Sequence, residues 1–406
     1  MERIETVIVG GGQAGLSLSY FLTQQRRAHV ILERAEHLAN TWRHARWDSF
    51  TLVTPNWQLR LPGFHYAGND PDGFLPRAEI VAYLEEYART FNPPVRFKTR
   101  VMSVDRNDDG YRVTTDQNVL HAKNVVVATG LFERPKLPPF STNLPRDILQ
   151  LHSSEYRNER ALPPGAILVV GSAQSGCQIA EELYQAGRKV YLCVGTAGRV
   201  PRRYRGKDSV WWLTESGFFD QPVDTLPSPK AKFAGNPHLS GKNGGHSLNL
   251  HQFARDGVTL LGRLNDARDD RIYLASNLHE SLAKVDQIET DLLKMIDDHI
   301  EKHGLNIPKE PVAQLRDGYA VEEISQLDLA SAQIKTIIWS AGYAFDFGWV
   351  HLPVFDNDGY PIQKQGITNF PGLYFLGLNW LHKRKSALFL GVGEDAAHIA
   401  GTITSL

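Results

Sequence analysis

Residues 7–34 read VIVGGGQAGLSLSYFLTQQRRAHVILER, and this stretch decides the fold. A β-branched strand runs into three spaced glycines, a helical pattern follows, and a second short strand ends in Glu33. Gly10 permits a tight turn, Gly12 lets the backbone approach a pyrophosphate, and Gly15 lets the helix pack closely on the strand. Because a carboxylate at the second strand's end accepts hydrogen bonds from a ribose, Glu33 completes a dinucleotide-binding fingerprint. A plain strand-helix-strand turn without a ligand is the alternative, which this ordered pattern disfavours.

A second stretch, VVGSAQSGCQIAEELYQAGRKVYLCV at 169–194, repeats this layout. Ala173 replaces the middle glycine and crowds the backbone approach only slightly. The position that corresponds to Glu33 is Val194, so the acid is missing. The sequence therefore predicts two nucleotide sites with different preferences.

Arginines follow the second fingerprint directly, in GTAGRVPRRYRGK at 195–207. An acid at the strand end would repel a ribose 2′-phosphate, whereas Arg199, Arg202 and Arg203 could bind it through charge-assisted hydrogen bonds. This pattern predicts NADPH in the second fold and FAD in the first, a pair that can exchange a hydride. A solvated basic loop without a ligand is the alternative interpretation.

The composition is that of an ordinary globular protein with two or three domains. The chain has 406 residues, of which 42% are hydrophobic and 22% charged, and its formal net charge is −1. Nothing in this balance favours nucleic acid or an anionic membrane. Cys177 and Cys193 form no CxxC pair, which indicates a reducing compartment. Since no apolar run of 18 residues and no leader pattern occurs, we expect a cytoplasmic enzyme without a membrane span.

These patterns predict an α/β fold with two Rossmann-like dinucleotide-binding domains. Two apolar strands that end in small-residue turns, NVVVATG at 124–130 and IIWSAGY at 337–343, mark the places where the chain crosses between domains. We expect the first part of an FAD-binding domain at 1–160, an inserted NADPH-binding domain with helical and loop insertion at 165–330, and the second part of the FAD-binding domain at 331–406.

Two segments of the inserted domain stand out. Residues 224–247 are rich in Pro, Gly and Ser and predict an irregular segment, while 278–303 has apolar residues at helical spacing. His299 and His303 have the spacing of a metal-ligand pair at the end of that helix. No third ligand is nearby, so a solvated face near the helix C-terminus is the favoured interpretation and no metal is expected.

Motifs along nearly the whole chain resemble the flavin-containing monooxygenases, including their bacterial flavoprotein relatives and the plant indole-pyruvate monooxygenases. They are GGGQAG at 10–15, TWRHARWDSFTLVTP at 41–55, ATGLFERPKLP at 128–138, HSSEY at 152–156, GSAQSGCQIAEEL at 171–183, IIWSAGY at 337–343 and PGLYFLG at 371–377. The resemblance implies FAD in the first fold, NADPH in the second, and transfer of oxygen from O2 to a small organic substrate through a C4a-hydroperoxyflavin.

The fingerprints and the resemblance together give a set of expected cofactor contacts. These are Gly10, Gly12, Gln13, Ala14, Gly15, Glu33, Arg34, Thr41, Trp42, Val101, Thr129, Gly130, Gly171, Ser172, Gln174, Ser175, Gly176, Arg199, Arg202, Arg203, Ala341, Gly342 and Gly377.

Departures from the family pattern narrow the chemistry. The Baeyer–Villiger subgroup has FxGxxxHxxxW, whereas here Arg146 and Ile148 replace its Phe and Gly ahead of His152, which makes ketone-to-ester chemistry less favoured. Animal-type members use an asparagine to hold the oxygenated flavin, and its position here is Val53. Either Asn56 takes that catalytic role in a shifted loop, or the role is absent.

Three functions stay open at this point. The first is an NADPH-dependent flavoprotein monooxygenase acting on a heteroatom or an activated carbon. The second is an FAD-dependent NADPH oxidase or electron-transfer reductase without oxygen insertion, and the third is a flavoprotein that senses nicotinamide status. The substrate is a small molecule in each catalytic case, and a homodimer is compatible with the sequence.

Overall fold

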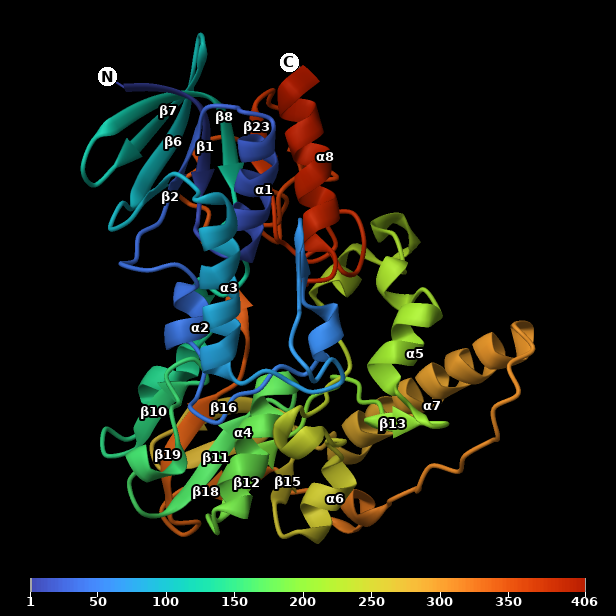
Figure 1. The fold of residues 1–406 in the computed structure, drawn as a ribbon. Coiled ribbons are helices and arrows are strands. Elements are labelled where there is room, and N and C mark those ends of the chain that lie inside the picture. Colours follow the sequence, from blue (N-terminus) through green and yellow to red (C-terminus); the bar gives the residue numbers. More distant parts are fainter. Residues whose placement is uncertain (1, 406) are drawn as a thin grey trace.

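The computed structural model describes residues 2–405 as two α/β domains, each built on its own sheet (Figure 1). The upper domain in this view contains both chain ends and a nine-stranded sheet, and the lower domain contains a five-stranded sheet. The predicted fold class is confirmed.

The first sheet has the order β21-β22-β23-β8-β1-β2-β5, and β6 and β7 extend from β8 as an antiparallel arm. Its strands are β1 (Glu2–Val9), β2 (His29–Leu32), β5 (Val95–Arg96), β6 (Val101–Asn107), β7 (Gly110–Thr115), β8 (Val119–Val127), β21 (Gln363–Lys364), β22 (Ile367–Thr368) and β23 (Leu373–Phe375). The helices of this domain are α1 (Gln13–Gln24), α2 (Asn40–His44), α3 (Arg77–Phe91) and α8 (Val392–Ser405). Because β1, β2, β8 and β23 run parallel, their carboxyl ends and the turns that follow them meet at one edge.

The second sheet is entirely parallel, in the order β10-β19-β11-β12-β15. Its strands are β10 (Leu149–His152), β11 (Ala166–Val170), β12 (Val190–Cys193), β15 (Thr259–Leu261) and β19 (Ile334–Trp339). An antiparallel sheet of β16 (Leu264–Arg268), β17 (Arg271–Leu274) and β18 (Gln326–Asp328) follows it. The helices are α4 (Gln174–Gln185), α5 (Ser209–Glu215), α6 (Leu250–Arg255) and α7 (Leu278–Lys302).

This topology corrects the predicted domain boundaries. The expected ranges placed residues 149–152 and 334–339 in the first domain, but β19 pairs with β11 on one side and with β10 on the other. Both strands therefore belong to the second sheet, and the second domain extends from about residue 149 to residue 339.

The two chain crossings between the domains lie side by side. Strand β9 (Arg134–Pro135) runs into the second domain and pairs antiparallel with β20 (Tyr343–Ala344), which returns from it. These crossings follow the turns at 128–130 and 340–342, as the sequence predicted. Two short hairpins, β3 (Arg60–Leu61) with β4 (Phe64–His65) and β13 (Arg203–Tyr204) with β14 (Lys207–Asp208), complete the strands.

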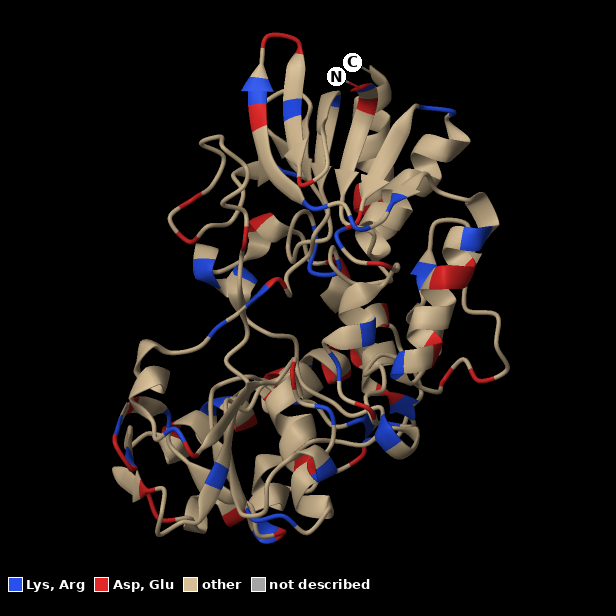
Figure 2. Cartoon of the chain, turned by 90° about the vertical axis from the view of Figure 1, so that its left-hand side faces the viewer, with Lys and Arg blue, Asp and Glu red and all other residues tan. Residues whose placement is uncertain are grey.

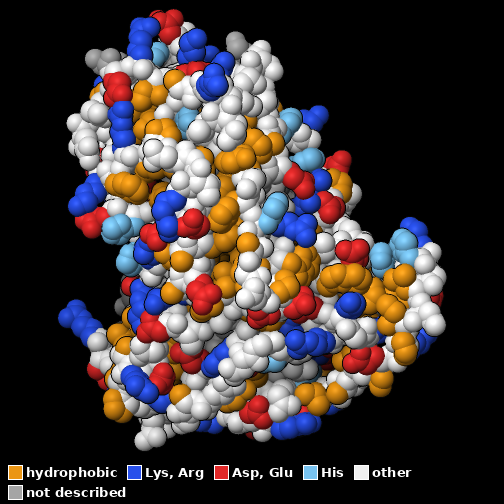
Figure 3. All heavy atoms as spheres, in the orientation of Figure 1, with side chains coloured by type: hydrophobic (Ala, Val, Ile, Leu, Met, Phe, Trp, Pro, Cys, Tyr) orange, Lys and Arg blue, Asp and Glu red, His pale blue; other side chains and the backbone are white. Residues whose placement is uncertain are grey.

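The two predicted segments of the second domain take the expected forms. Residues 224–247 contain short 3-10 turns and isolated β-bridges but no longer element, and α7 buries its apolar residues along one face. Basic and acidic positions are interspersed over both domains, and they are mixed likewise on the face shown in space-filling form (Figures 2 and 3). Among residues 2–405, no helix is both long enough and apolar enough to cross a membrane.

Candidate functional site

A cleft of about 1160 Å³ lies where the two domains meet, and both glycine-rich turns open onto it. Its walls include most of the residues that the sequence marked as cofactor contacts. These are Gly10, Gly12, Gln13, Ala14, Glu33, Arg34, Thr41, Trp42, Val101, Thr129, Gly130, Gln174, Ser175, Ala341, Gly342 and Gly377. The two fingerprints, about 160 residues apart in the sequence, therefore contribute to one volume.

The first turn has room for a ligand backbone because of its glycines. Gly10 has φ +112°, and a Cβ atom there would lie 2.6 Å from the carbonyl oxygen of Ala128. A Cβ atom on Gly15 would lie 2.0 Å from the carbonyl oxygen of Gly10, so this glycine lets α1 pack against β1. Gly12 faces open space instead. Gly10 and Gly15 thus have the structural tasks that the sequence assigned to them, and approach of a pyrophosphate at Gly12 stays a prediction.

Glu33 stands at the end of β2 with its carboxylate held in place. One carboxylate oxygen accepts a hydrogen bond from the Gly11 amide at 2.8 Å, and the other accepts one from the Ala35 amide at 2.8 Å. Next to it, Arg34 forms an ion pair with Glu133 at 2.7 Å. Burial raises the pKa of Glu133, and the Arg34 charge opposes that rise.

The start of α1 is open to an anion. Gly12 caps the helix without a side-chain hydrogen bond, and the first turn contains no acidic residue, so its amides are free to bind phosphate. Thr129 adds a buried hydroxyl without a partner among the described residues, and Gly130 faces open space. These groups fit a pyrophosphate, and Glu33 fits the ribose beyond it.

Aromatic side chains form the wall beyond this turn. Trp42 stacks on Phe389 with ring centroids 5.8 Å apart, and both line the cleft. The side-chain amide of Gln13 donates to the carbonyl oxygen of Ala387 at 2.7 Å, which connects the C-terminal segment to α1. Gly377 also lets the chain after β23 lie close to α1, because a Cβ atom there would lie 2.6 Å from Ala14 Cβ. The wall suits a planar ring system.

The second turn repeats the first. A Cβ atom on Gly176 would lie 1.8 Å from the carbonyl oxygen of Gly171, so α4 packs on β11 as α1 packs on β1. Helix α4 also begins without a side-chain cap or an acidic residue. The side chain of Gln174 donates to the Leu239 carbonyl at 2.6 Å and accepts from the Leu239 amide at 3.1 Å. Ser172 differs from expectation, because its buried hydroxyl accepts the Gly195 amide at 2.9 Å and does not line the cleft.

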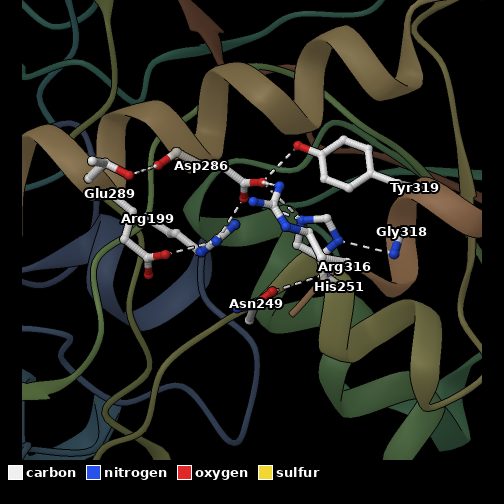
Figure 4. A network of polar contacts seen from close by, with 9 residues as sticks. Arg199, Asn249, His251, Asp286, Glu289, Arg316, Gly318 and Tyr319 are labelled. Atoms are coloured by element: carbon white, nitrogen blue, oxygen red, sulfur yellow. Dashed lines mark hydrogen bonds and ion pairs between the residues drawn. The ribbon is translucent and has the colours of Figure 1, made fainter. Parts of the chain in front are cut away.

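The prediction that Arg199 binds a nucleotide phosphate is wrong in this structure. Its guanidinium is 4% exposed and pairs with Asp286 and Glu289 of α7, each at 2.8 Å (Figure 4). The same network includes His251, whose Nε2 lies 3.2 Å from Asp286, and Tyr319, whose hydroxyl donates to Asp286 at 2.7 Å. Arg199 therefore holds α7 against the segment that follows β12.

Arg202 needs the same correction. It is 2% exposed, pairs with Asp208 at 2.6 Å and donates to the carbonyl oxygen of Val53 at 2.8 Å. The ion pair with Asp208 balances the Arg202 charge, and the hydrogen bond to Val53 connects the second domain to the first. Arg203 is exposed, and its contact with the Gly244 carbonyl is 3.4 Å long. Of the three arginines, only Arg203 keeps a cation available to solvent.

The proposed catalytic role of Asn56 is also wrong in this structure. Its side-chain amide donates to the Asp70 carbonyl at 2.9 Å, and its side-chain oxygen accepts the Leu75 amide at 2.8 Å. Asn56 is 2% exposed and does not line the cleft. Both polar atoms hold the loop at 70–75, so the alternative that the family's asparagine role is absent here is favoured.

The three histidines and the cysteine described next make contacts that support the fold. His152 Nε2 lies 3.1 Å from the Gly342 carbonyl, which connects β10 to the returning chain, and burial lowers its pKa. His299 and His303 lie with tilted rings, centroids 4.2 Å apart, at the end of α7. Within residues 2–405, no three His, Cys, Asp or Glu side chains are grouped to hold a metal. Cys177 is buried, donates to the Ser172 carbonyl and has a raised pKa because of burial.

Known proteins match this architecture. The family model described as pyridine nucleotide-disulphide oxidoreductase matches residues 7–218. An uncharacterized CzcO-like oxidoreductase of Geobacillus kaustophilus is 32% identical over 98% of both chains. Indole-3-pyruvate monooxygenase YUCCA1 of Oryza sativa is 32% identical over 50% of this chain and 52% of its own length. The solved flavin-containing monooxygenase of Stenotrophomonas maltophilia superposes with a TM-score of 0.68, at 19% identity, over 100% of this chain and 99% of that one.

The chain belongs to the pyridine nucleotide-disulphide oxidoreductase family, and it is similar to flavin-containing monooxygenases. It is a flavoprotein oxidoreductase of the oxygenase kind that uses a flavin and a nicotinamide nucleotide.

Sequence reasoning missed three residues of the cleft. Ser340 has a buried hydroxyl without a partner among the described residues, and its place in the SAG turn, next to the ATG turn, could have marked it. Arg46 lies with its guanidinium carbon 5.2 Å from the Trp42 ring and 4.7 Å from the Phe132 ring. Gln178 of α4 lines the cleft as well. Neither Arg46 nor Gln178 has a sequence signal, because only tertiary packing brings them to the cleft.

Proposed function

We propose that the protein is an FAD- and NADPH-dependent monooxygenase that inserts one oxygen atom from O2 into a small organic substrate, at a heteroatom or an activated carbon. One observation carries this proposal: two uncapped helix starts open onto one cleft, and only one of the two strand ends beside them has a carboxylate. When bound, the flavin accepts a hydride from the nicotinamide and activates oxygen.

The position of Glu33 supports FAD over FMN. Each carboxylate oxygen already accepts one amide hydrogen bond and has lone-pair capacity for another. A ribose hydroxyl can therefore bind at the strand end without displacing Gly11 or Ala35. FMN has no adenosine ribose to use this group, so the carboxylate would contribute nothing to its affinity.

The second strand end supports NADPH over NADH. Val194 is neutral, so nothing at this position repels a 2′-phosphate. Arg203 is exposed, and Arg263 follows β15, the strand next to β12. Arg263 is exposed too, and the side-chain contacts of these two arginines are with the Gly244 carbonyl and with Asn265, not with a carboxylate. These two cations are the candidates for contact with the phosphate, in place of the buried Arg199 and Arg202.

The chain itself would exclude water from the reacting atoms. Trp42, Phe50 and Phe389 line the cleft, and Trp42 packs against both phenylalanines, with ring centroids 6.0 Å from Phe50 and 5.8 Å from Phe389. A water-poor wall at the flavin favours transfer of oxygen to substrate over loss of the activated oxygen as peroxide. The relative named as an indole-3-pyruvate monooxygenase supports a small organic substrate.

The test is to follow the oxygen. Purified protein should contain FAD, and its turnover with NADPH, oxygen-18 gas and a panel of small sulfides, amines and ketones should place one labelled atom in a product for each NADPH consumed. Stoichiometric hydrogen peroxide with no labelled product would instead establish an NADPH oxidase. A protein that binds FAD and NADPH but consumes no NADPH would favour the sensor interpretation.

A further inference from the structure

One part of the cleft is apolar and lies between α4, α5 and the segment at 52–58. We call it the apolar end, and six residues define it: Leu52, Val210, Leu213, Phe219, Leu239 and Leu388. Five of these six pack in a single hydrophobic cluster with each other. The sixth, Leu52, packs in the neighbouring core cluster with Phe50 and Leu75 and lines the same cleft.

The apolar end has no charged side chain in its wall. The charged residues that line the cleft come from other segments: 33–34, Arg46, Arg100, 133–136, Lys232 and the loop positions 346 and 358. Three cations lie near this cluster, but none of them lines the cleft: Arg384 lies 3.9 Å from the Phe218 ring and donates to Gln221, and the other two are paired with carboxylates. Arg202 is paired with Asp208, and Lys385 is paired with Asp220 at 2.8 Å and with Glu394. Because none of these cations lines the cleft, a bound anion would meet no cation in the wall of the apolar end.

Gln178 provides the polar group of this region. It lies on α4 four residues after Gln174 and four before Glu182, so the three side chains share one face of the helix. Gln174 is bonded to the Leu239 backbone, and Glu182 accepts a hydrogen bond from Ser49. Gln178 therefore lies between Leu239 and the segment at 49–58.

The side-chain oxygen of Gln178 lacks a hydrogen-bond donor. Oε1 is buried and has no partner among the described residues, while the residue lines the cleft at 7% exposure. A buried acceptor without a donor is costly, and a ligand that supplies an N–H or O–H group removes that cost. The unpartnered oxygen thus indicates a ligand with a donor.

We propose that the apolar end selects an uncharged, largely apolar substrate that donates one N–H or O–H hydrogen bond to Gln178, and that it rejects carboxylates. This inference rests on the proposed monooxygenase function. A carboxylate would lose its hydration without gaining a cation, whereas a neutral donor would satisfy Oε1. A site built around a hydrogen-bonding group discriminates strongly against analogues that lack the matching group. Gln178 is then a specificity-determining residue, and the apolar residues exclude charge.

The experiment compares three aryl alkyl sulfides of equal length that end in a carboxamide, a carboxylate or a methyl group. Sulfoxide formation with the full-length enzyme should favour the carboxamide over the carboxylate by about 100-fold in kcat/KM. Gln178→Leu should lower kcat/KM for the carboxamide by about 30-fold and leave the methyl-terminated sulfide unchanged. Gln185→Leu, on the exposed side of the same helix, is the matched control and should change neither.

A charge placed in the wall should reverse the preference. Leu213→Arg supplies a cation and should raise kcat/KM for the carboxylate at least tenfold relative to the carboxamide. Leu305→Arg adds the same charge on the surface, where Leu305 is 38% exposed, and should leave the preference as it was.

The outcomes separate the two claims. Equal or better turnover of the carboxylate by the wild-type enzyme would overturn the inference and leave the monooxygenase function standing. If Gln178→Leu slows flavin reduction by NADPH and keeps the sulfide preference, Gln178 binds the nicotinamide, which also overturns the inference. If none of the three sulfides, nor any member of the wider panel, yields an oxygenated product, the proposed function fails and the inference fails with it.

Discussion

The two nucleotide folds of this chain are built alike around their glycines. A Cβ atom added at Gly10 would lie 2.6 Å from the facing carbonyl oxygen, and one added at Gly171 would lie 2.7 Å from its own. A Cβ atom added at Gly15 would lie 2.0 Å from the carbonyl oxygen of Gly10, and one added at Gly176 would lie 1.8 Å from that of Gly171. Both helices begin without side-chain caps. Close packing of strand, turn and helix therefore imposes the same geometry twice.

The folds differ in how the turn is connected to the end of the second strand. In the first fold the Gly11 amide donates to the Glu33 side chain, so the strand end supplies the acceptor. In the second fold the Gly195 amide donates to the Ser172 side chain, so the turn supplies it. Each fold therefore joins its turn to its strand end by one hydrogen bond, but the donor lies in the turn of the first fold and at the strand end of the second. The comparison teaches that the glycines set the shape of the fold, whereas the strand-end residue is free to select the ligand.

The largest expected effect comes from the glycines that the folds share. Gly15→Ala and Gly176→Ala each place a Cβ atom against a carbonyl oxygen, so α1 or α4 must move away from its strand. We expect each to lower the free energy of unfolding by about 3 kcal/mol. Gly15→Ala should abolish flavin binding, and Gly176→Ala should keep the flavin but lose its reduction by NADPH. Flavin content and thermal melting measure both effects.

Gly12→Ala is the control for these variants, because a Cβ atom there meets open space. It should weaken flavin binding without lowering the melting temperature. If Gly176→Ala released flavin as completely as Gly15→Ala, the two folds would not be independent binding units.

The next effect concerns the strand end of the first fold. Glu33→Gln keeps an acceptor for the Gly11 amide but removes the negative charge and the second oxygen, which accepts the Ala35 amide, so the bond to a ribose hydroxyl becomes weaker. Loss of charge assistance costs about 2 kcal/mol, or roughly thirtyfold in the dissociation constant for FAD. Equilibrium dialysis of apoprotein with FAD and with FMN measures it. An equal loss for FMN would show that Glu33 only holds the turn.

Local rules explain why the sequence predicted the two folds correctly. A turn needs its glycines at fixed spacing from the strand, and those needs are met within about 30 residues. The domain boundaries were harder to predict from the sequence, because β19 joins the second sheet only by pairing with β11, and β10 only by pairing with β19. Pairing between strands far apart in sequence leaves no mark in either strand alone.

The predicted roles of single side chains were wrong where the hydrogen-bonding partner of the side chain lies far away in the sequence. Arg199 follows the fingerprint directly, but its partners lie on α7, some 90 residues later. The prediction for Asn56 depends on the register of its loop, and the side-chain amide of Asn56 forms hydrogen bonds with the backbone of residues 70 and 75. A buried ion pair or a loop bridge is invisible until both halves are placed. The aromatic wall and Gln178 depend in the same way on tertiary packing.

A smaller effect tests the strand end of the second fold. Val194→Glu restores the acid of the first fold, and its charge should repel a 2′-phosphate more than a 2′-hydroxyl. The ratio of kcat/KM for NADPH to that for NADH should fall about tenfold, which corresponds to roughly 1.4 kcal/mol. Val194→Gln has the same size without the charge and should leave the ratio unchanged. A fall with both variants would assign the effect to crowding, since Val194 is buried.

The smallest effect separates the exposed arginines from the buried ones. Arg203→Ala removes an exposed cation, and such a contact is worth up to about 1 kcal/mol, so NADPH affinity should fall roughly fivefold while NADH affinity stays the same. Arg263→Ala is the parallel variant at the end of the neighbouring strand. Arg202→Ala should behave differently, because it leaves Asp208 without its partner and should lower stability with equal loss for both nucleotides. Isothermal titration with each nucleotide, together with melting curves, distinguishes the three. If neither Arg203→Ala nor Arg263→Ala changes the preference while Val194→Glu does, the preference for NADPH comes from the missing acid alone.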